Sequence, residues 1–101
     1  MFLHIISVDY VDNYQIKIQF SDHRVGTVDL VDSLTGTVFK PLQDLSLFQQ
    51  FDVDPDLGTV RWTNGADFAP EYLYFLAFRD LPELQEQFEQ WGYLPTKVAM
   101  G

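Results

Sequence analysis

Residues 14–20 carry the sequence YQIKIQF, in which apolar and polar side chains alternate without interruption. A period of two is typical of a strand that buries one face, and the buried face here would consist of Tyr14, Ile16, Ile18 and Phe20. Turn-forming residues flank this strand, and residues 24–30 predict another strand after it. Connections of two to four residues cannot make a parallel crossover, so the first 30 residues predict an antiparallel three-strand meander.

The strand before it, within residues 2–10, is apolar on both faces near its start. Such a strand is usually central in a sheet or covered on both faces, and we expect one of these positions for it. The turn after the second strand contains Asp22 and His23. If these two residues form a two-residue hairpin of the primed type, both need a positive φ, and we expect a left-handed His23.

Residues 51–53 and 60–62 predict a second hairpin, in which Phe51 and Val53 face Val60 and Trp62. The intervening turn contains a proline that presets φ and Gly58, which accepts a positive φ. Before this hairpin, Asp44 is placed to cap a short helical turn. That turn would direct Leu45 and Phe48 towards the sheet.

The last third of the chain is expected to be helical. Pro70 suits the first turn of a helix that runs to about Arg79 and is apolar almost all round, so it needs cover on more than one side. A second helix opens with Asp80-Leu81-Pro82-Glu83, a variant of the capping box, and ends at Gly92, with an apolar stripe of Leu81, Leu84, Phe88 and Trp91. The predicted fold is α+β: an antiparallel sheet of about five strands, a meander plus a hairpin, with two C-terminal helices packed on one face.

Length and composition restrict the class of protein. The 101 residues suit a single domain, 1–101, and 47% hydrophobic residues are too many for a disordered chain. The absence of cysteine excludes disulfides, thiolate zinc sites and a cysteine nucleophile. With 15 acidic and 6 basic residues the net charge is −9, which opposes binding to nucleic acid or anionic membranes. No targeting signal or membrane-length apolar run is present in the sequence, so we expect a cytoplasmic protein.

The sequence offers little support for metal or catalytic chemistry. Residues 52–58 have acids at alternating positions, as the first ligands of an EF-hand calcium loop do. However, Gly58 stands at loop position 7 instead of 6, and position 12 is Thr63, which cannot supply the bidentate carboxylate. An acidic hairpin turn explains them better. His4 and His23 lack zinc-ligand spacing, and no serine lies in a G-x-S-x-G elbow. We therefore expect no catalytic residue, no cofactor and no metal.

The densest feature is the stretch 61–74, RWTNGADFAPEYLY. In a structural interpretation Trp62 and Tyr72 are core residues, Asn64-Gly65 forms a turn, and Asp67 and Glu71 favour the start of a helix. In a functional interpretation the chain is a small ligand-binding domain or enzyme that uses Asp67 and Glu71 beside Trp62. That alternative requires a concave pocket with converging polar groups.

Four stretches together resemble a known pattern: 12–22 (DNYQIKIQFSD), 29–30 (DL), 38–44 (VFKPLQD), and WTNGAD with EYLY within 62–74. They resemble the small bacterial family catalogued as domain of unknown function 2442, with its motifs F-x-D-G, D-L, F-x-P-L-x-D and W-x-N-G-x-D-x-x-P-E-x-L-Y. His23 stands where the family usually has glycine. The resemblance covers about 5–78, so we expect a family-like α+β core within 1–78 and an additional helix and tail in 80–101.

The resemblance implies a non-catalytic protein-interaction module, because the family has no established catalytic residues and many relatives lie beside a second small protein in a toxin–antitoxin-like arrangement. Some relatives carry a helix-turn-helix domain after this one, which this chain is too short to include, so direct nucleic-acid binding is not expected. The acidic charge favours association with a basic partner. The expected role is the neutralising or accessory partner of such a pair. The candidate partner-binding residues are Trp62, Asn64, Asp67, Glu71, Phe88 and Trp91.

Self-association is a further expectation. Residues 72–78 surround a short helix with apolar side chains, and a second apolar stripe follows directly. Apolar surface left uncovered would favour a homodimer through residues 72–91. Alternatively, the tail from Tyr93 to Val98 folds back as the missing cover.

Overall fold

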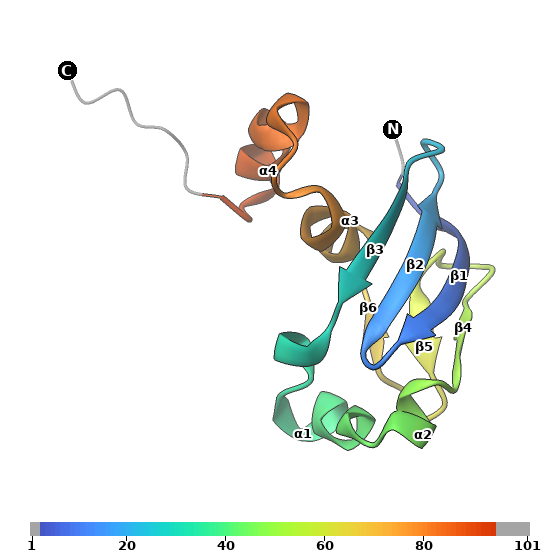
Figure 1. Cartoon of the computed structure of the whole chain (residues 1–101). Coiled ribbons are helices and arrows are strands. Elements are labelled where there is room, and N and C mark those ends of the chain that lie inside the picture. The colour runs from blue at the N-terminus through green and yellow to red at the C-terminus, as the bar shows by residue number, and fades with distance from the viewer. Residues whose placement is uncertain (1–2, 95–101) are drawn as a thin grey trace.

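The computed structural model of the chain describes residues 3–94, and these contain two antiparallel sheets of three strands each (Figure 1). The strands of the first sheet are β1 (Ile5–Asp12), β2 (Gln15–Phe20) and β3 (Val25–Asp29). Those of the second are β4 (Phe51–Val53), β5 (Val60–Trp62) and β6 (Asp67–Phe68). The α+β class is therefore confirmed.

The first sheet is the predicted meander, with β2 in the centre. Ile16, Ile18 and Phe20 are fully buried beneath it, as their alternation predicts. The expectation that the first strand is central or covered on both faces is wrong, because β1 lies at an edge and Ile6 is 51% exposed. The pairing of β1 shifts register between Ile5 and Ser7, so this irregularity interrupts the alternation and leaves Ile6 on the outside.

The second sheet contains the predicted hairpin in its predicted register, with Phe51 opposite Trp62 and Val53 opposite Val60. The expected single sheet of five strands is replaced by two sheets, because the chain continues past β5 into the short strand β6. Gly65, with φ 90°, does not merely end the strand: it turns the chain back so that β6 pairs with β5.

Both sheets contain the same turn between their second and third strands. In the first, the Phe20 N–H donates to the Arg24 carbonyl and the His23 N–H to the Phe20 carbonyl, both over 2.9 Å. Trp62 and Gly65 make the equivalent bonds in the second sheet, at 2.8 and 3.0 Å. The loop is three residues long and ends in a left-handed residue, so it is not the two-residue primed turn expected for Asp22-His23. His23 is left-handed as predicted, with φ 73°.

Short helices join the two sheets, in the order η1 (Val31–Ser33), α1 (Gly36–Phe39), η2 (Lys40–Gln43) and α2 (Leu45–Phe48). Asp44 caps α2 as predicted, since its carboxylate accepts the Ser46 N–H over 2.9 Å. Phe48 is fully buried, whereas Leu45 remains 38% exposed and does not pack as expected.

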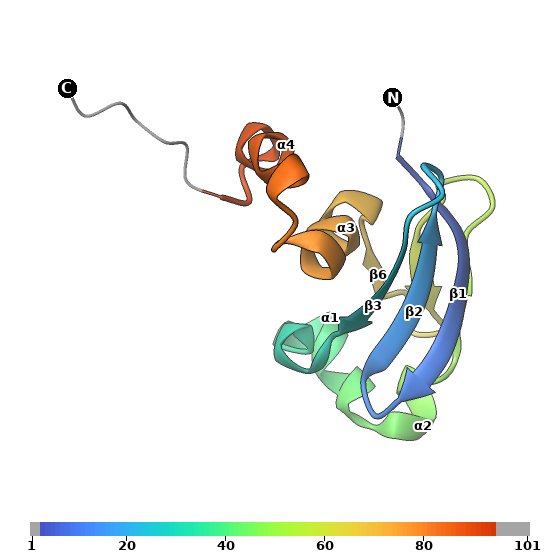
Figure 2. The same ribbon diagram turned by 45° about the horizontal axis from the view of Figure 1, so that its top comes forward.

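The C-terminal helices form successive layers. Helix α3 (Pro70–Phe78) packs against β3, and η3 (Pro82–Leu84) leads into α4 (Gln85–Trp91). Both views place α3 between α4 and the sheets, so the expectation that both helices pack on one sheet face is wrong (Figures 1 and 2). Helix α3 is covered by β3 on one side and by α4 on the other, which accounts for its apolar side chains on almost every face. Asp80 does not cap the second helix, whose first turn follows Leu81 without a side-chain cap, whereas Gly92 ends it in the left-handed conformation as predicted.

Within residues 3–94, no helix is both long and apolar enough to cross a membrane.

Candidate functional site

Two of the candidate partner-binding residues, Trp62 and Asn64, hold the connecting helices against the second sheet. Trp62 is 3% exposed, and its indole N–H donates to the carbonyl of Phe48 over 2.7 Å. The Asn64 side chain donates to the Val38 carbonyl over 3.0 Å and accepts the Ala66 N–H over 3.1 Å. Both side chains thus have structural partners within the domain.

Phe88 and Trp91 lie on α4 and join it to α3. Phe88 is fully buried, with its ring centroid 5.2 Å from that of Phe75. Trp91 is half-buried, and its ring meets that of Tyr74 edge-on at 5.9 Å. Beyond α4, the ring of Tyr93 stacks on Phe75 at 5.1 Å and so covers part of α3.

The predicted homodimer through 72–91 stays a prediction, and the surface that motivated it is smaller than expected. Within the described part of the chain, the large apolar side chains that remain exposed all lie between Ile6 and Leu57. Tyr93 supplies part of the cover that the alternative interpretation assigned to the tail from Tyr93 to Val98. The rest of that tail, from residue 95, lies outside the described residues.

Asp67 and Glu71 do not meet beside Trp62. Asp67 is exposed on β6 opposite Arg61, whereas Glu71 is half-buried in the first turn of α3. Burial raises the pKa of the Tyr93 hydroxyl above its ordinary value, and the nearby charge of Glu71 adds to this shift. The two acids therefore belong to separate surroundings.

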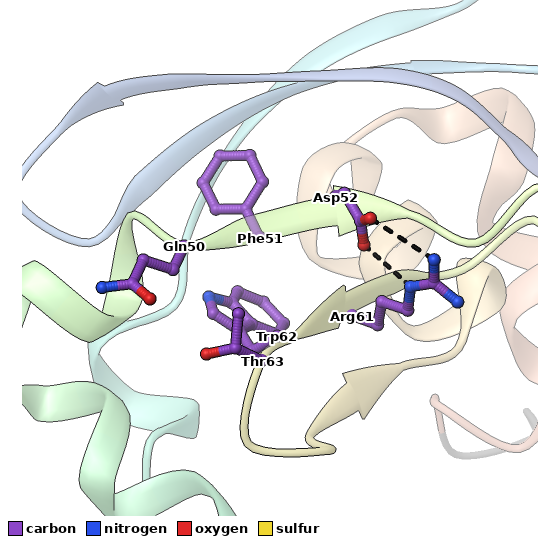
Figure 3. Close-up of a pocket in the computed structure, with 6 residues that line it drawn as sticks. All are labelled: Gln50, Phe51, Asp52, Arg61, Trp62 and Thr63. Atoms are coloured by element: carbon purple, nitrogen blue, oxygen red, sulfur yellow. Dashed lines mark hydrogen bonds and ion pairs between the residues drawn. The ribbon is translucent and has the colours of Figure 1, made fainter.

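The outer face of the second sheet carries an ion pair between neighbouring strands. Arg61 binds Asp52 in a bidentate manner through two guanidinium nitrogens: Nε donates to Oδ1 over 2.8 Å and Nη2 to Oδ2 over 3.3 Å (Figure 3). Nη1 reaches Asp54 Oδ2 at 3.2 Å. The hydrogen bonds from Arg61 lower the pKa of Asp52, so this exposed carboxyl remains ionised to lower pH than usual.

A hollow of about 440 Å³ opens on this face. Its lining residues are those drawn in Figure 3: Gln50, Phe51, Asp52, Arg61, Trp62 and Thr63. Neither Asp67 nor Glu71 lines it, so the hollow beside Trp62 does not gather the carboxylates that the ligand-binding or enzymatic alternative requires.

The acidic loop 52–58 uses its carboxylates to build the turn. Asp54 Oδ1 accepts the N–H groups of Asp56 and Leu57 over 2.8 and 3.1 Å, and these bonds lower the pKa of Asp54. Gly58 adopts φ 66°, as predicted. Among residues 3–94 no group of three or more His, Cys, Asp or Glu side chains could hold a metal ion.

A second concave surface was not predicted from the sequence. It is a cleft of about 490 Å³ between the turn at 21–24 and the helices α3 and α4. Its lining residues are Leu3, Asp22, Arg24, Tyr74, Leu84, Gln87 and Trp91. Trp91 is the one candidate residue among them.

Asp22 is the centre of the polar group in this cleft. Its Oδ2 accepts the Tyr74 hydroxyl over 2.6 Å and lies 3.4 Å from Arg24 Nε, while Oδ1 accepts the Arg24 N–H over 3.0 Å. Burial, together with the bond to Asp22, raises the pKa of Tyr74 to about 12. Asp22 and Tyr74 lie in two of the motifs that resemble the family, but no spacing in the sequence indicates that these motifs meet.

Comparison with known proteins identifies this chain by family and by fold. The family model described as "Protein of unknown function (DUF2442)" matches residues 5–88, which extends ten residues beyond the expected range of 5–78 and into α4. The crystal structure of "Putative DNA Binding Protein NE0471" from Nitrosomonas europaea is similar, with a TM-score of 0.71 and 20% sequence identity over 92% of this chain. This chain spans 63% of that protein's length. No curated protein matches the chain.

Proposed function

The chain belongs to the DUF2442 family of proteins of unknown function, and we propose that it is a non-catalytic protein-interaction module whose partner carries a basic surface. This proposal rests on the excess of acidic over basic residues and on the pairing of two arginines. Acidic residues outnumber basic ones by 15 to 6, and two of the arginines, Arg24 in the turn before β3 and Arg61 on β5, are already paired with carboxylates of this chain. The surface therefore favours a cationic partner.

The polar residues of the family-like motifs support the same proposal. Asp22 and Asn64 hydrogen-bond to other parts of the domain and Asp44 caps α2, so these motifs maintain the fold. As the resemblance to the family implies, the proposed role is that of the neutralising or accessory member of a toxin–antitoxin-like pair. The alternative, a ligand-binding domain or enzyme that uses Asp67 and Glu71 beside Trp62, is the weaker proposal because these residues do not share a pocket.

DNA binding is the second candidate, since the similar Nitrosomonas protein is described in those terms. The net charge of −9 opposes it in this chain, because phosphate would be repelled by most of the surface.

Co-expression with the product of the neighbouring gene tests the proposal. We expect the two proteins to elute together in size-exclusion chromatography at 50 mM NaCl, and the complex to weaken at 500 mM because salt screens the attraction. Separate elution at low salt would overturn the proposal. Binding of this chain to duplex DNA at about 150 mM salt would favour the second candidate instead.

A further inference from the structure

The cleft beside α4 is lined by both apolar and polar side chains. Leu3, Leu84 and the half-buried Trp91 form the apolar part, and Asp22, Arg24, Tyr74 and Gln87 form the polar part. At about 490 Å³, it can hold one long side chain and part of the backbone that carries it.

At this cleft two carboxylates, those of Asp22 and Glu83, lie near one guanidinium, that of Arg24. Arg24 is the basic residue of the lining, and Asp22 offsets its charge from 3.4 Å. Glu83 Oε1 lies 3.8 Å from Arg24 Nη1, and the Glu83 side chain is 61% exposed, so a second cation can reach it.

Arg24 shows how a guanidinium can occupy this place. Its Nε end meets Asp22 and its Nη1 end faces Glu83, while 39% of the side chain remains exposed. An incoming basic side chain could lie alongside it, with its aliphatic stem on Leu84 and its charge close to Glu83. Trp91 supplies an aromatic ring in the same lining, and among aromatic side chains indole attracts cations most strongly.

We infer that this cleft accepts an arginine or lysine side chain from an extended basic segment of the partner protein. The inference rests on the proposed function and names the surface that performs it. Trp91 and Glu83 are the recognition residues, whereas Asp22 and Tyr74 position Arg24.

Titration of the ¹⁵N-labelled chain with a defined peptide tests this inference. The probe is an acetylated and amidated hexapeptide of alternating arginine and leucine, and its counterpart has glutamate in place of arginine. We expect saturable shifts of the Trp91 indole and Gln87 amide signals with the arginine peptide alone. Weaker binding in 500 mM NaCl is expected too, because salt screens these charges.

A matched pair of variants separates the cleft from general charge. Glu83→Gln and Glu86→Gln remove the same charge from neighbouring turns, but Glu83 alone lies near Arg24. We expect Glu83→Gln to weaken the affinity about threefold to fivefold and Glu86→Gln less than twofold. Trp91→Phe retains an aromatic ring for packing and should weaken binding less than Trp91→Ala, provided that both variants keep the wild-type circular dichroism spectrum.

The outcomes distinguish the cleft from the broader proposal. Equal losses from Glu83→Gln and Glu86→Gln, or shifts confined to the face around Arg61, would overturn the inference that this cleft binds the basic side chain. The broader proposal of a basic partner would still stand. An arginine peptide that shifts no signal would overturn the cleft as well. The fate of the proposed function is decided separately by co-elution with the neighbouring gene product.

Discussion

Asp22 and Asn64 occupy the same position in the twin turns of the two sheets. Each accepts the backbone N–H two residues ahead, from Arg24 and Ala66, and each is followed by a left-handed residue. Their second polar atoms differ in use, because Asp22 accepts the hydroxyl of Tyr74 and Asn64 donates to the carbonyl of Val38. One local rule of turn chemistry therefore serves two different long-range contacts.

The left-handed residue of the first turn gives a prediction. His23 has φ 73°, where glycine is comfortable and a residue with a Cβ is not, so His23→Gly should be neutral or mildly stabilising. His23→Ala retains a Cβ and should be less stable than His23→Gly by about 1 kcal/mol. Urea unfolding measures the difference, and an alanine variant more stable than the glycine variant would show that φ is negative in solution.

The Tyr74 hydroxyl gives a prediction about alkaline stability. Its pKa is about 12 in the folded chain against an ordinary 10, so the neutral form is favoured by folding. The resulting stability is complete below pH 10 and is lost as pH rises through 12, and it amounts to about 2–3 kcal/mol. Tyr74→Phe should cost about 1–2 kcal/mol at pH 8, and because wild type loses about 2 kcal/mol between pH 10 and 12, its advantage over the variant should vanish and then reverse in this range.

Tyr10→Phe is the matched control for this experiment. The Tyr10 hydroxyl donates to the Asn13 carbonyl at an exposed site, so its removal should cost about 0.5 kcal/mol or less. If Tyr10→Phe and Tyr74→Phe destabilise the chain equally at pH 8, the contact between Tyr74 and Asp22 contributes nothing special to stability.

The contact between α3 and β3 depends on the absence of one side chain. A Cβ on Gly26 would lie 2.9 Å from Ala77 Cβ and 3.0 Å from the ring of Phe78. Real side chains do not approach so closely, so α3 can lie against β3 only because residue 26 is glycine. This contact also fixes the position of α4, which is carried by α3.

Gly26→Ala should destabilise the chain by about 1–3 kcal/mol, because α3 must move away from β3. Ala77→Gly removes one of the two obstructing groups, so the double variant should be more stable than the sum of the single changes predicts. Thermal unfolding of the four proteins provides the cycle. Strict additivity would show that the helix does not pack on Gly26 as described.

Sequence reasoning succeeded for elements defined by local chemistry. The β2 alternation, the register of β4 with β5, the Asp44 cap and the stop at Gly92 each depend on a few adjacent residues. It failed where distant segments decide the outcome. A two-residue strand such as β6 is too short to show a period, and the cleft residues Asp22 and Tyr74 are 52 positions apart. The apolar pattern of α3 correctly predicted that the helix is covered on more than one side, but it did not predict that α4 covers one of them.

At the scale of the whole molecule, charge opposes compactness. A net charge of −9 on 101 residues repels itself, and salt screens that repulsion. Raising NaCl from 20 to 300 mM should therefore increase the melting temperature by roughly 5 °C, equivalent to about 1 kcal/mol. A decrease would mean that ion pairs such as Arg61 with Asp52 outweigh the repulsion.

The oligomeric state is the second prediction at this scale. A homodimer through 72–91 would be seen in sedimentation at micromolar concentration as twice the monomer mass of 11.7 kDa. Trp91→Ala should then weaken it and Glu86→Ala should not. Phe88→Ala would also disturb the contact with Phe75 inside one chain, so it tests the dimer less directly. A monomer at this concentration would refute the dimer.

The two tryptophans give the molecule a built-in pair of fluorescent reporters. Trp62 lies in the core with 3% of its surface exposed, and Trp91 lies on α4 at a half-buried position. Replacing either by phenylalanine leaves one emitter, so the same urea titration can be observed once from the centre of the fold and once from its periphery. If the two curves coincide, α4 melts together with the sheets. If the Trp91 curve comes first, α4 opens as a separate unit while the twin sheets remain folded.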